Sequence, residues 1–168
     1  YNGMNDQYWD YPVMQGNQQS MHFAFLFNWA GKPWSTQKWS RSIIDRYYGF
    51  GTGNAYLGDE DQGQMGAVSA LMALGIFDFD GGAKIDPDYD ITIPVFDELI
   101  ISLHPDYYDA KEFTIKKITA DDEQEGTQII RIEGNGMEIQ SYQFTQVQLN
   151  DGLIINIFLS PAANKNHN

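Results

Sequence analysis

The spacing of apolar residues changes near Lys84, and the change divides the chain into two regions. Upstream of Lys84, clusters of apolar residues alternate with glycine-containing loops, and over 35–48 the apolar residues lie on one helical face. This pattern predicts three helices, the first capped by Ser20 and each followed by a glycine that can end it. The predicted helices cover residues 21–28, 35–48 and 63–74, and the glycines are Gly31, Gly49 and Gly75.

Downstream of Lys84, polar and apolar residues alternate, which is the period of a strand with one buried face. Six strands without intervening helices predict an antiparallel β-sandwich. The pair Asp151-Gly152 tolerates positive φ and predicts a hairpin turn before the last strand. The predicted strands cover residues 89–93, 98–103, 112–118, 127–133, 137–148 and 153–159. The expected fold class is α+β, with a helical region over 1–82 and a β-sandwich domain over 83–168.

The helix predicted over 63–74 is apolar on almost every face, which is typical of a helix inside a larger assembly. Three consecutive carboxylates, Asp59, Glu60 and Asp61, precede it. The partial positive charge and free N–H groups of a helix N-terminus keep nearby carboxylates ionised, which suits a general base or a cation ligand. The local pattern leaves a second interpretation open, in which Asp59 or Asp61 only caps the helix.

Composition narrows the classes of function. A net charge of −13 over 168 residues argues against a nucleic-acid-binding protein, because phosphate binding requires clusters of basic residues. No stretch reaches the apolar length of a membrane span, and no signal peptide is visible. The chain opens on Tyr1 rather than an initiator methionine, so we expect an internal fragment. Without cysteine, the chain has neither disulfides nor thiolate metal sites nor a cysteine nucleophile.

Five motifs occur in a fixed order along the first two thirds of the chain. They cover Gly16–His22, Leu26–Gln37, Gly58–Met65, Ala73–Phe77 and Ile93–Asp97. They are similar, in this order, to Gly-Asn-Glu-Pro-Ser-His-His, Leu-Tyr-Asn-Tyr-Ala-Gly-Lys-Pro-Trp-x-Thr-Gln, Gly-Asn/Asp-Glu-Asp-x-Gly-Gln-Met, Ala-Leu-Gly-Phe-Tyr and Ser-Pro-Leu-Phe-Asp. Those five motifs are found in the C-terminal portion of family 92 glycoside hydrolases, the calcium-dependent exo-acting α-mannosidases, which this chain therefore resembles.

The resemblance implies both a fold and an activity. The family's active site lies in an (α/α)6 barrel followed by a β-domain, so residues 1–82 would be the last barrel helices and 83–168 the C-terminal β-sandwich domain. The implied activity is inverting hydrolysis of α-mannosides, of the α-1,2 type, on glycans in the bacterial periplasm or outside the cell. The family's general acid lies upstream of Tyr1, so this chain would supply only the base side and would need the N-terminal part of the same polypeptide.

The resemblance also assigns roles to individual residues. Asp59 and Asp61 match the family's aspartates on the base side of the reaction. Substrate contacts are expected from Gln18, His22 and Gln64, and neutral oxygen ligands for calcium are expected from Asn17, Gln18 and Gln37. The chain departs from the family's first motif, where Gln19 stands in place of a proline and two further residues also differ. Gln18 stands in place of a glutamate and Met21 in place of the first histidine, and loss of a carboxylate lowers the affinity for a cation.

Two other functions stay open at this point. One is a non-catalytic carbohydrate-binding or scaffold β-sandwich module, and the other is a related (α/α)6 glycosidase acting on another sugar. A helix-loop-helix calcium site at the acidic segment fails, because the glutamate required at its twelfth position would fall at Ala70.

Helices taken out of a closed barrel would also expose apolar faces, expected around Phe25, Trp39 and Met65. Such faces predict self-association unless the rest of the polypeptide covers them. Trp39 and Trp34 are read as barrel core rather than as platforms for a sugar ring.

Overall fold

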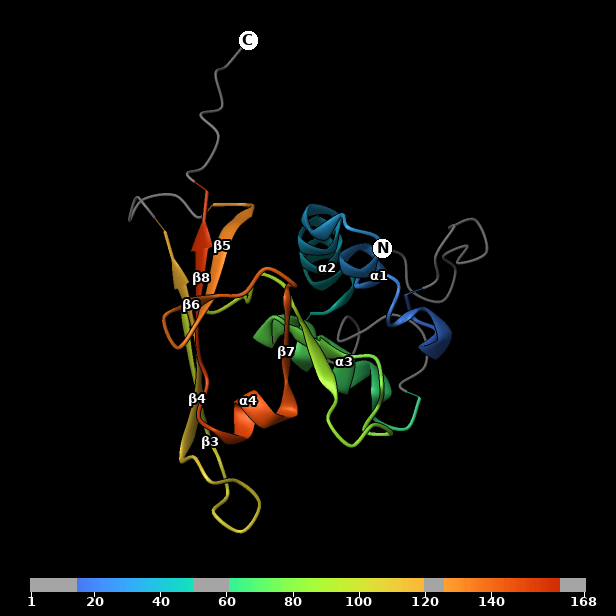
Figure 1. Ribbon diagram of the computed structural model, residues 1–168. Helices are drawn as coiled ribbons and strands as arrows, with labels where there is room; N and C mark the ends of the chain where they lie inside the picture. The colour runs from blue at the N-terminus through green and yellow to red at the C-terminus, as the bar shows by residue number, and fades with distance from the viewer. Residues whose placement is uncertain (1–14, 50–60, 120–125, 161–168) are drawn as a thin grey trace, which may run out of the picture.

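The computed structural model describes residues 15–49, 61–119 and 126–160 (Figure 1). Its helices are η3 (Gln18–Ser20), α1 (Leu26–Trp29), α2 (Pro33–Tyr47), α3 (Gln64–Leu74) and α4 (Gln146–Asn150). Its strands are β1 (Ile76–Asp78), β2 (Asp88–Ile91), β3 (Glu98–Ser102), β4 (Glu112–Ile118), β5 (Ile129–Gly134), β6 (Met137–Glu138), β7 (Gln143–Thr145) and β8 (Ile154–Leu159). None of these helices is long and apolar enough to cross a membrane.

The strands form two sheets that differ in pairing. Strands β1, β2 and β7 make a three-stranded antiparallel sheet in the order β1-β2-β7. The larger sheet has the order β3-β4-β8-β5-β6, and within it β4 and β8 run parallel. Figure 1 shows the larger sheet at one side, helices α1, α2 and α3 at the other, and β7 of the smaller sheet between them.

Two of the predicted helices are confirmed and one is wrong over most of its length. Helix α2 starts on Pro33, whose fixed φ suits a first helical residue. Helix α3 ends at Gly75, which takes the left-handed conformation at φ 79°. The helix expected over 21–28 is α-helical only in α1. In the turns before α1, hydrogen bonds join residues three apart instead of four, such as Phe25 N to His22 O at 3.0 Å. Aromatic residues lose side-chain freedom in a regular α-helix, which disfavours one here.

The strand expected over 137–148 is also wrong. It divides into β6, an irregular stretch with Tyr142 at φ 55°, strand β7 in the other sheet, and helix α4. Thr145 and Gln148 form a reciprocal capping box that starts α4, which the alternation pattern does not reveal.

The turn at Asp151 and Gly152 ends α4 and does not close a hairpin. Strand β8 then pairs in parallel with β4, so the expectation of a wholly antiparallel sandwich is wrong. Strand β1 is a further departure, because it lies within the region predicted to be helical and pairs with β2 across residue 82. The predicted domain boundary between residues 82 and 83 lies between β1 and β2, which are hydrogen-bonded to each other. The boundary itself stays a prediction.

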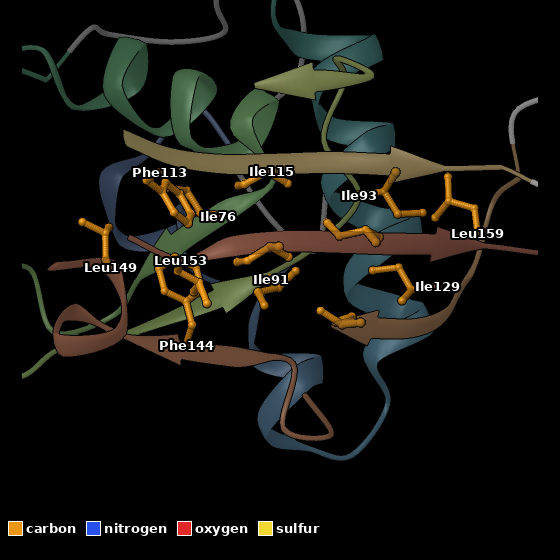
Figure 2. Packing of buried hydrophobic residues seen from close by; sticks show 13 residues of the cluster. Ile76, Ile91, Ile93, Phe113, Ile115, Ile129, Phe144, Leu149, Leu153 and Leu159 are labelled. Atoms are coloured by element: carbon orange, nitrogen blue, oxygen red, sulfur yellow. The ribbon is translucent and has the colours of Figure 1, made fainter. Parts of the chain in front are cut away.

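A large apolar core lies between the two sheets (Figure 2). Ile91 and Phe144 face it from the small sheet, and Phe113 and Ile155 face it from the large one. The rings of Phe113 and Phe144 meet at 5.3 Å between centroids. Alternation along a strand turns the next residue to the opposite face, so the small sheet also has a face toward the helices.

The second core lies on that other face. It consists of buried residues from α3, from β1 and from the turn just before α1, namely Ala24, Phe25, Val68, Met72 and Phe77. The rings of Phe25 and Phe77 stack at 4.4 Å with an interplanar angle of 11°. The expectation that Phe25 and Met65 would be uncovered is wrong, since both are fully buried within this chain.

Candidate functional site

The turn before α3 holds Asp61, the one predicted base that lies within the described residues; Asp59 and Glu60 lie outside them. Asp61, Gln62 and Gly63 all have positive φ, at 54°, 62° and 91°. For a residue with a side chain this conformation costs about 1–2 kcal/mol. Two such residues in succession mark a turn that the surrounding structure enforces, and such strain concentrates at functional sites.

The same turn bears on the capping interpretation. The N-cap of α3 is Gly63, which has no side chain to accept a hydrogen bond. Asp61 instead accepts a bond through its backbone oxygen from Gln64 N at 3.3 Å. Asp61 is therefore not the N-cap of α3, and its partly exposed carboxylate is left for another role. For Asp59 both interpretations stay open.

Helix α3 is buried on one face only within this chain. Met65, Val68 and Met72 are buried, whereas Gly66, Ala67 and Ala70 on the other side are exposed. The exposed residues are small and apolar, so the helix offers a surface against which another helix can pack closely.

The segment before α1 carries the other predicted contacts. Asn17 and Gln18 are exposed, while Ser20 N donates a hydrogen bond to Asn17 O at 2.8 Å and fixes the turn. His22 is partly buried and its ring meets Phe79 edge-on at 5.9 Å between centroids. The ring of His22 is thus held by packing.

Gln37 has a structural partner in the large sheet. Its side chain is buried, and its Oε1 accepts a hydrogen bond from Ile129 N at 2.9 Å. Among the described residues, no group of three or more histidines and carboxylates is arranged to hold a metal ion. The assignments of Asn17, Gln18 and Gln37 as calcium ligands stay predictions.

A buried carboxylate that the sequence interpretation missed lies between the helices and β2. Asp90 is fully buried; its Oδ1 accepts from Asn28 Nδ2 at 2.9 Å and its Oδ2 from Trp29 Nε1 at 3.1 Å. Burial raises the pKa of the Asp90 carboxyl above its ordinary value, and the hydrogen bonds from Asn28 and Trp29 oppose that rise. The available signal was a carboxylate between Tyr89 and Ile91 within a predicted strand.

A second polar link lies two residues further along the chain. The hydroxyls of Ser40 and Thr92, both buried, are 3.0 Å apart and join α2 to the residue that follows β2. Together with Gln37, these links fix the helices to both sheets by hydrogen bonds between distant parts of the chain.

Two hollows that are lined by described residues flank α2. The larger, of about 720 Å³, lies between α2 and the segment around α1 and is mainly apolar, with Phe23, Leu26, Phe27, Trp39 and Ile43 in its wall. The smaller, of about 320 Å³, lies where α2 meets the β region and includes Trp34 and Tyr142. Trp39 is 42% exposed and Trp34 is more so, so neither is core within this chain, although both were expected to be core in the barrel.

Comparisons with known proteins agree on one family. The model of the glycosyl hydrolase family 92 catalytic domain matches residues 2–161. An uncharacterized secreted glycosidase of Arthroderma benhamiae is 27% identical over 123 residues, which cover 73% of this chain and 15% of that protein.

Two solved structures from Bacteroides thetaiotaomicron share the fold. A family GH92 α-mannosidase superposes with a TM-score of 0.74 at 24% identity, covering 92% of this chain and 20% of that one. A family GH92 inverting mannosidase superposes with a TM-score of 0.71 at 29% identity, covering 89% and 19%. The chain thus spans about a fifth of the length of these structures.

Proposed function

The chain belongs to glycosyl hydrolase family 92, and from this membership we propose that it is part of an enzyme that hydrolyses α-mannosides, releasing mannose from glycans. Two structural relatives with similar folds are described as an α-mannosidase and an inverting mannosidase. We extend the proposal to inversion, to an α-1,2 linkage, and to action in the bacterial periplasm or outside the cell. The Arthroderma relative, named a secreted glycosidase, supports the last point.

In this proposal α1, α2 and α3 are the last helices of an (α/α)6 barrel and the two sheets form its β-sandwich domain. The exposed small face of α3 and the apolar hollow beside α2 support it, because both are surfaces that a neighbouring barrel helix would cover. That neighbour would come from the remaining part of the same polypeptide, since this chain spans about a fifth of its structural relatives.

The chemistry assigned to this chain is that of the general base. Inversion requires one carboxylate to take a proton from water while an acid on the opposite side of the sugar protonates the leaving oxygen, with about 6.5–9.5 Å between the two groups. Asp61 and Asp59 would activate and orient that water, and the acid would come from the rest of the polypeptide. The enforced positive-φ turn at Asp61 is the observation that supports this role.

Substrate contacts would come from Gln18 and His22 before α1 and from Gln64 at the start of α3. Gln18 and Gln64 are exposed and His22 partly so, which leaves their polar atoms accessible to a sugar. Calcium takes six to eight oxygen ligands, so a bound ion would need further ligands besides the amide oxygens of Asn17, Gln18 and Gln37.

The test is the Asp61→Asn variant of the intact enzyme, assayed by single-turnover hydrolysis of an aryl α-mannoside. Asparagine keeps the size of the side chain and tolerates positive φ, so the turn is preserved while the base is removed. We expect a fall in rate of roughly 10²–10⁴-fold, which is the usual contribution of a general base.

Asp45→Asn is the matched control, because Asp45 is an exposed carboxylate on α2 that pairs with Arg41 at 3.2 Å. Its rate should stay at the wild-type value. A near-normal rate for Asp61→Asn would remove Asp61 from catalysis, and a normal rate after treatment with a chelator would remove the calcium requirement.

A further inference from the structure

Phe79 lies between two rings that belong to different parts of the site. Its ring meets His22 edge-on at 5.9 Å and Trp29 edge-on at 5.9 Å, with interplanar angles of 73° and 79°. It also meets Phe77 at 5.1 Å, and Phe77 is part of the buried helical core. Edge-to-face pairs are directional, so a ring held on several sides restricts the orientation of each neighbour.

A hydrogen bond to Asp90, rather than burial, orients the Trp29 side chain. The Trp29 side chain is 61% exposed, yet its Nε1 donates a hydrogen bond to Asp90 Oδ2 at 3.1 Å. The neighbouring Asn28 occupies the other carboxylate oxygen at 2.9 Å and also donates to Ile91 O at 3.3 Å. Bonds to a buried carboxylate are among the stronger hydrogen bonds in proteins, so this pair fixes the end of α1 against β2.

From these contacts we infer that Asp90 is a positioning residue for His22, acting through Trp29 and Phe79. The carboxylate fixes the indole, the indole edge limits the Phe79 ring, and the Phe79 ring limits the imidazole. A residue of the β region thereby sets the orientation of a side chain that is far from it in sequence. The consequence for catalysis rests on the proposed function, in which His22 contacts the sugar.

The Ser40–Thr92 hydroxyl pair supplies a matched control. It is also buried and also ties a helix to the chain around β2, but none of the described ring contacts involves either residue. Thr92→Val keeps the shape and removes the hydroxyl. Asp90→Asn also keeps the shape, but it replaces one of the two acceptor oxygens with an NH₂ group, so Trp29 and Asn28 no longer each have an oxygen of their own to donate to.

The first readout needs no substrate. In the intact enzyme with isotope-labelled histidine, the imidazole resonances of His22 are assigned by their loss in His22→Gln. Asp90→Asn and Phe79→Leu should each shift these resonances, whereas Thr92→Val should lower the unfolding midpoint and leave them in place. Unmoved resonances in a folded Asp90→Asn protein would overturn the inference. If Asp90→Asn does not fold, Trp29→Phe removes the donor while keeping a ring, and the same two outcomes apply.

The second readout is a comparison of KM with kcat on an α-mannoside. Asp90→Asn and Phe79→Leu should raise KM by roughly tenfold, within the range expected for a misplaced contact, and change kcat less. Thr92→Val should change neither at a temperature where it is fully folded. Shifted resonances with an unchanged KM would support the positioning role and would instead remove His22 from substrate binding.

Discussion

The β region and the helical region of this chain are stabilised in different ways. Between the two sheets lies a closed apolar core in which Ile91, Ile155 and Ile157 are fully buried. The helices share a smaller core, hold to the sheets through buried hydrogen bonds, and leave Trp29, Trp34 and Trp39 exposed. The difference indicates that the β region has a large core of its own, while the helical region is also held to the sheets by hydrogen bonds.

The groups proposed for chemistry lie in the less enclosed region. Asp61 sits in an enforced turn and His22 beside an aromatic cluster, both among the helices. Substitutions in the core between the sheets should therefore change stability, whereas substitutions at Asp61 and His22 should mainly change activity.

The largest expected effect on stability comes from emptying the core between the sheets. Phe113→Ala should lower the free energy of unfolding by about 3–5 kcal/mol, because it removes a buried ring and leaves a cavity. Phe23→Ala is the counterpart in the helical region, where the ring is 38% exposed, and should cost about 1 kcal/mol or less. Urea unfolding of both variants makes the comparison, and equal losses would contradict the difference between the regions.

The next effect concerns the junction between α3 and β1. Gly75 has φ 79°, and an added Cβ would lie 2.8 Å from Pro94 N and 2.9 Å from Thr92 O. Gly75→Ala should therefore destabilise the chain by about 2–3 kcal/mol. Gly31→Ala is the control, because Gly31 has φ 68° but no atom within 4 Å of an added Cβ, so only the backbone cost of about 1–2 kcal/mol applies. Equal unfolding midpoints would show that the close approach of the backbone is unimportant.

A smaller effect is expected for the hydroxyl pair between α2 and the chain after β2. Thr92→Val should lower the free energy of unfolding by about 1 kcal/mol, since it leaves the buried Ser40 hydroxyl without this partner. Ser40→Ala combined with Thr92→Val should recover part of the loss, because no polar group then remains unsatisfied. If the double variant loses more stability than the two single variants together, this account of the Ser40–Thr92 pair is wrong.

The last effect depends on pH. Burial raises the pKa of Asp90 in the folded chain, so the folded state binds this proton more tightly than the unfolded state. Its stabilising contribution is complete below the unfolded pKa of about 3.9 and is lost as pH rises through the folded pKa.

Relative to Asp90→Asn, the wild-type chain should therefore become less stable as pH rises above about 4, with a slope of at most about 1.4 kcal/mol per pH unit. Urea unfolding of both proteins across that range measures the difference. A flat or rising difference would show that Asp90 does not titrate in this way.

The pattern of apolar residues and glycines correctly predicted several helices and strands. The helix over 63–74 was recognised because it is uniformly apolar and ends at Gly75, and the strand over 112–118 agrees with β4 residue for residue. The prediction for 137–148 was wrong because alternation of polar and apolar residues does not reveal the capping box of Thr145 and Gln148. The hydrogen bonds of this box start a helix where the alternation predicted a strand.

Pairings between distant parts of the chain could not be predicted from local pattern. The parallel pairing of β4 with β8 and the donors to Asp90 both join residues far apart in sequence. The candidate site came from motif resemblance rather than from spacing. Its geometry is visible at Asp61 and His22, whereas Asp59 lies outside the described residues.

One paired measurement tests the division between the regions most directly. Single-turnover hydrolysis per folded molecule and the unfolding midpoint are measured side by side for Asp61→Asn and for Ile157→Val in the intact enzyme. We expect Asp61→Asn to lose roughly 10²–10⁴-fold in rate with little change in midpoint, and Ile157→Val to lose about 0.5–1.5 kcal/mol of stability with an unchanged rate. A normal rate in folded Asp61→Asn, or a large loss of rate in folded Ile157→Val, would contradict the assignment of catalysis to the helical region.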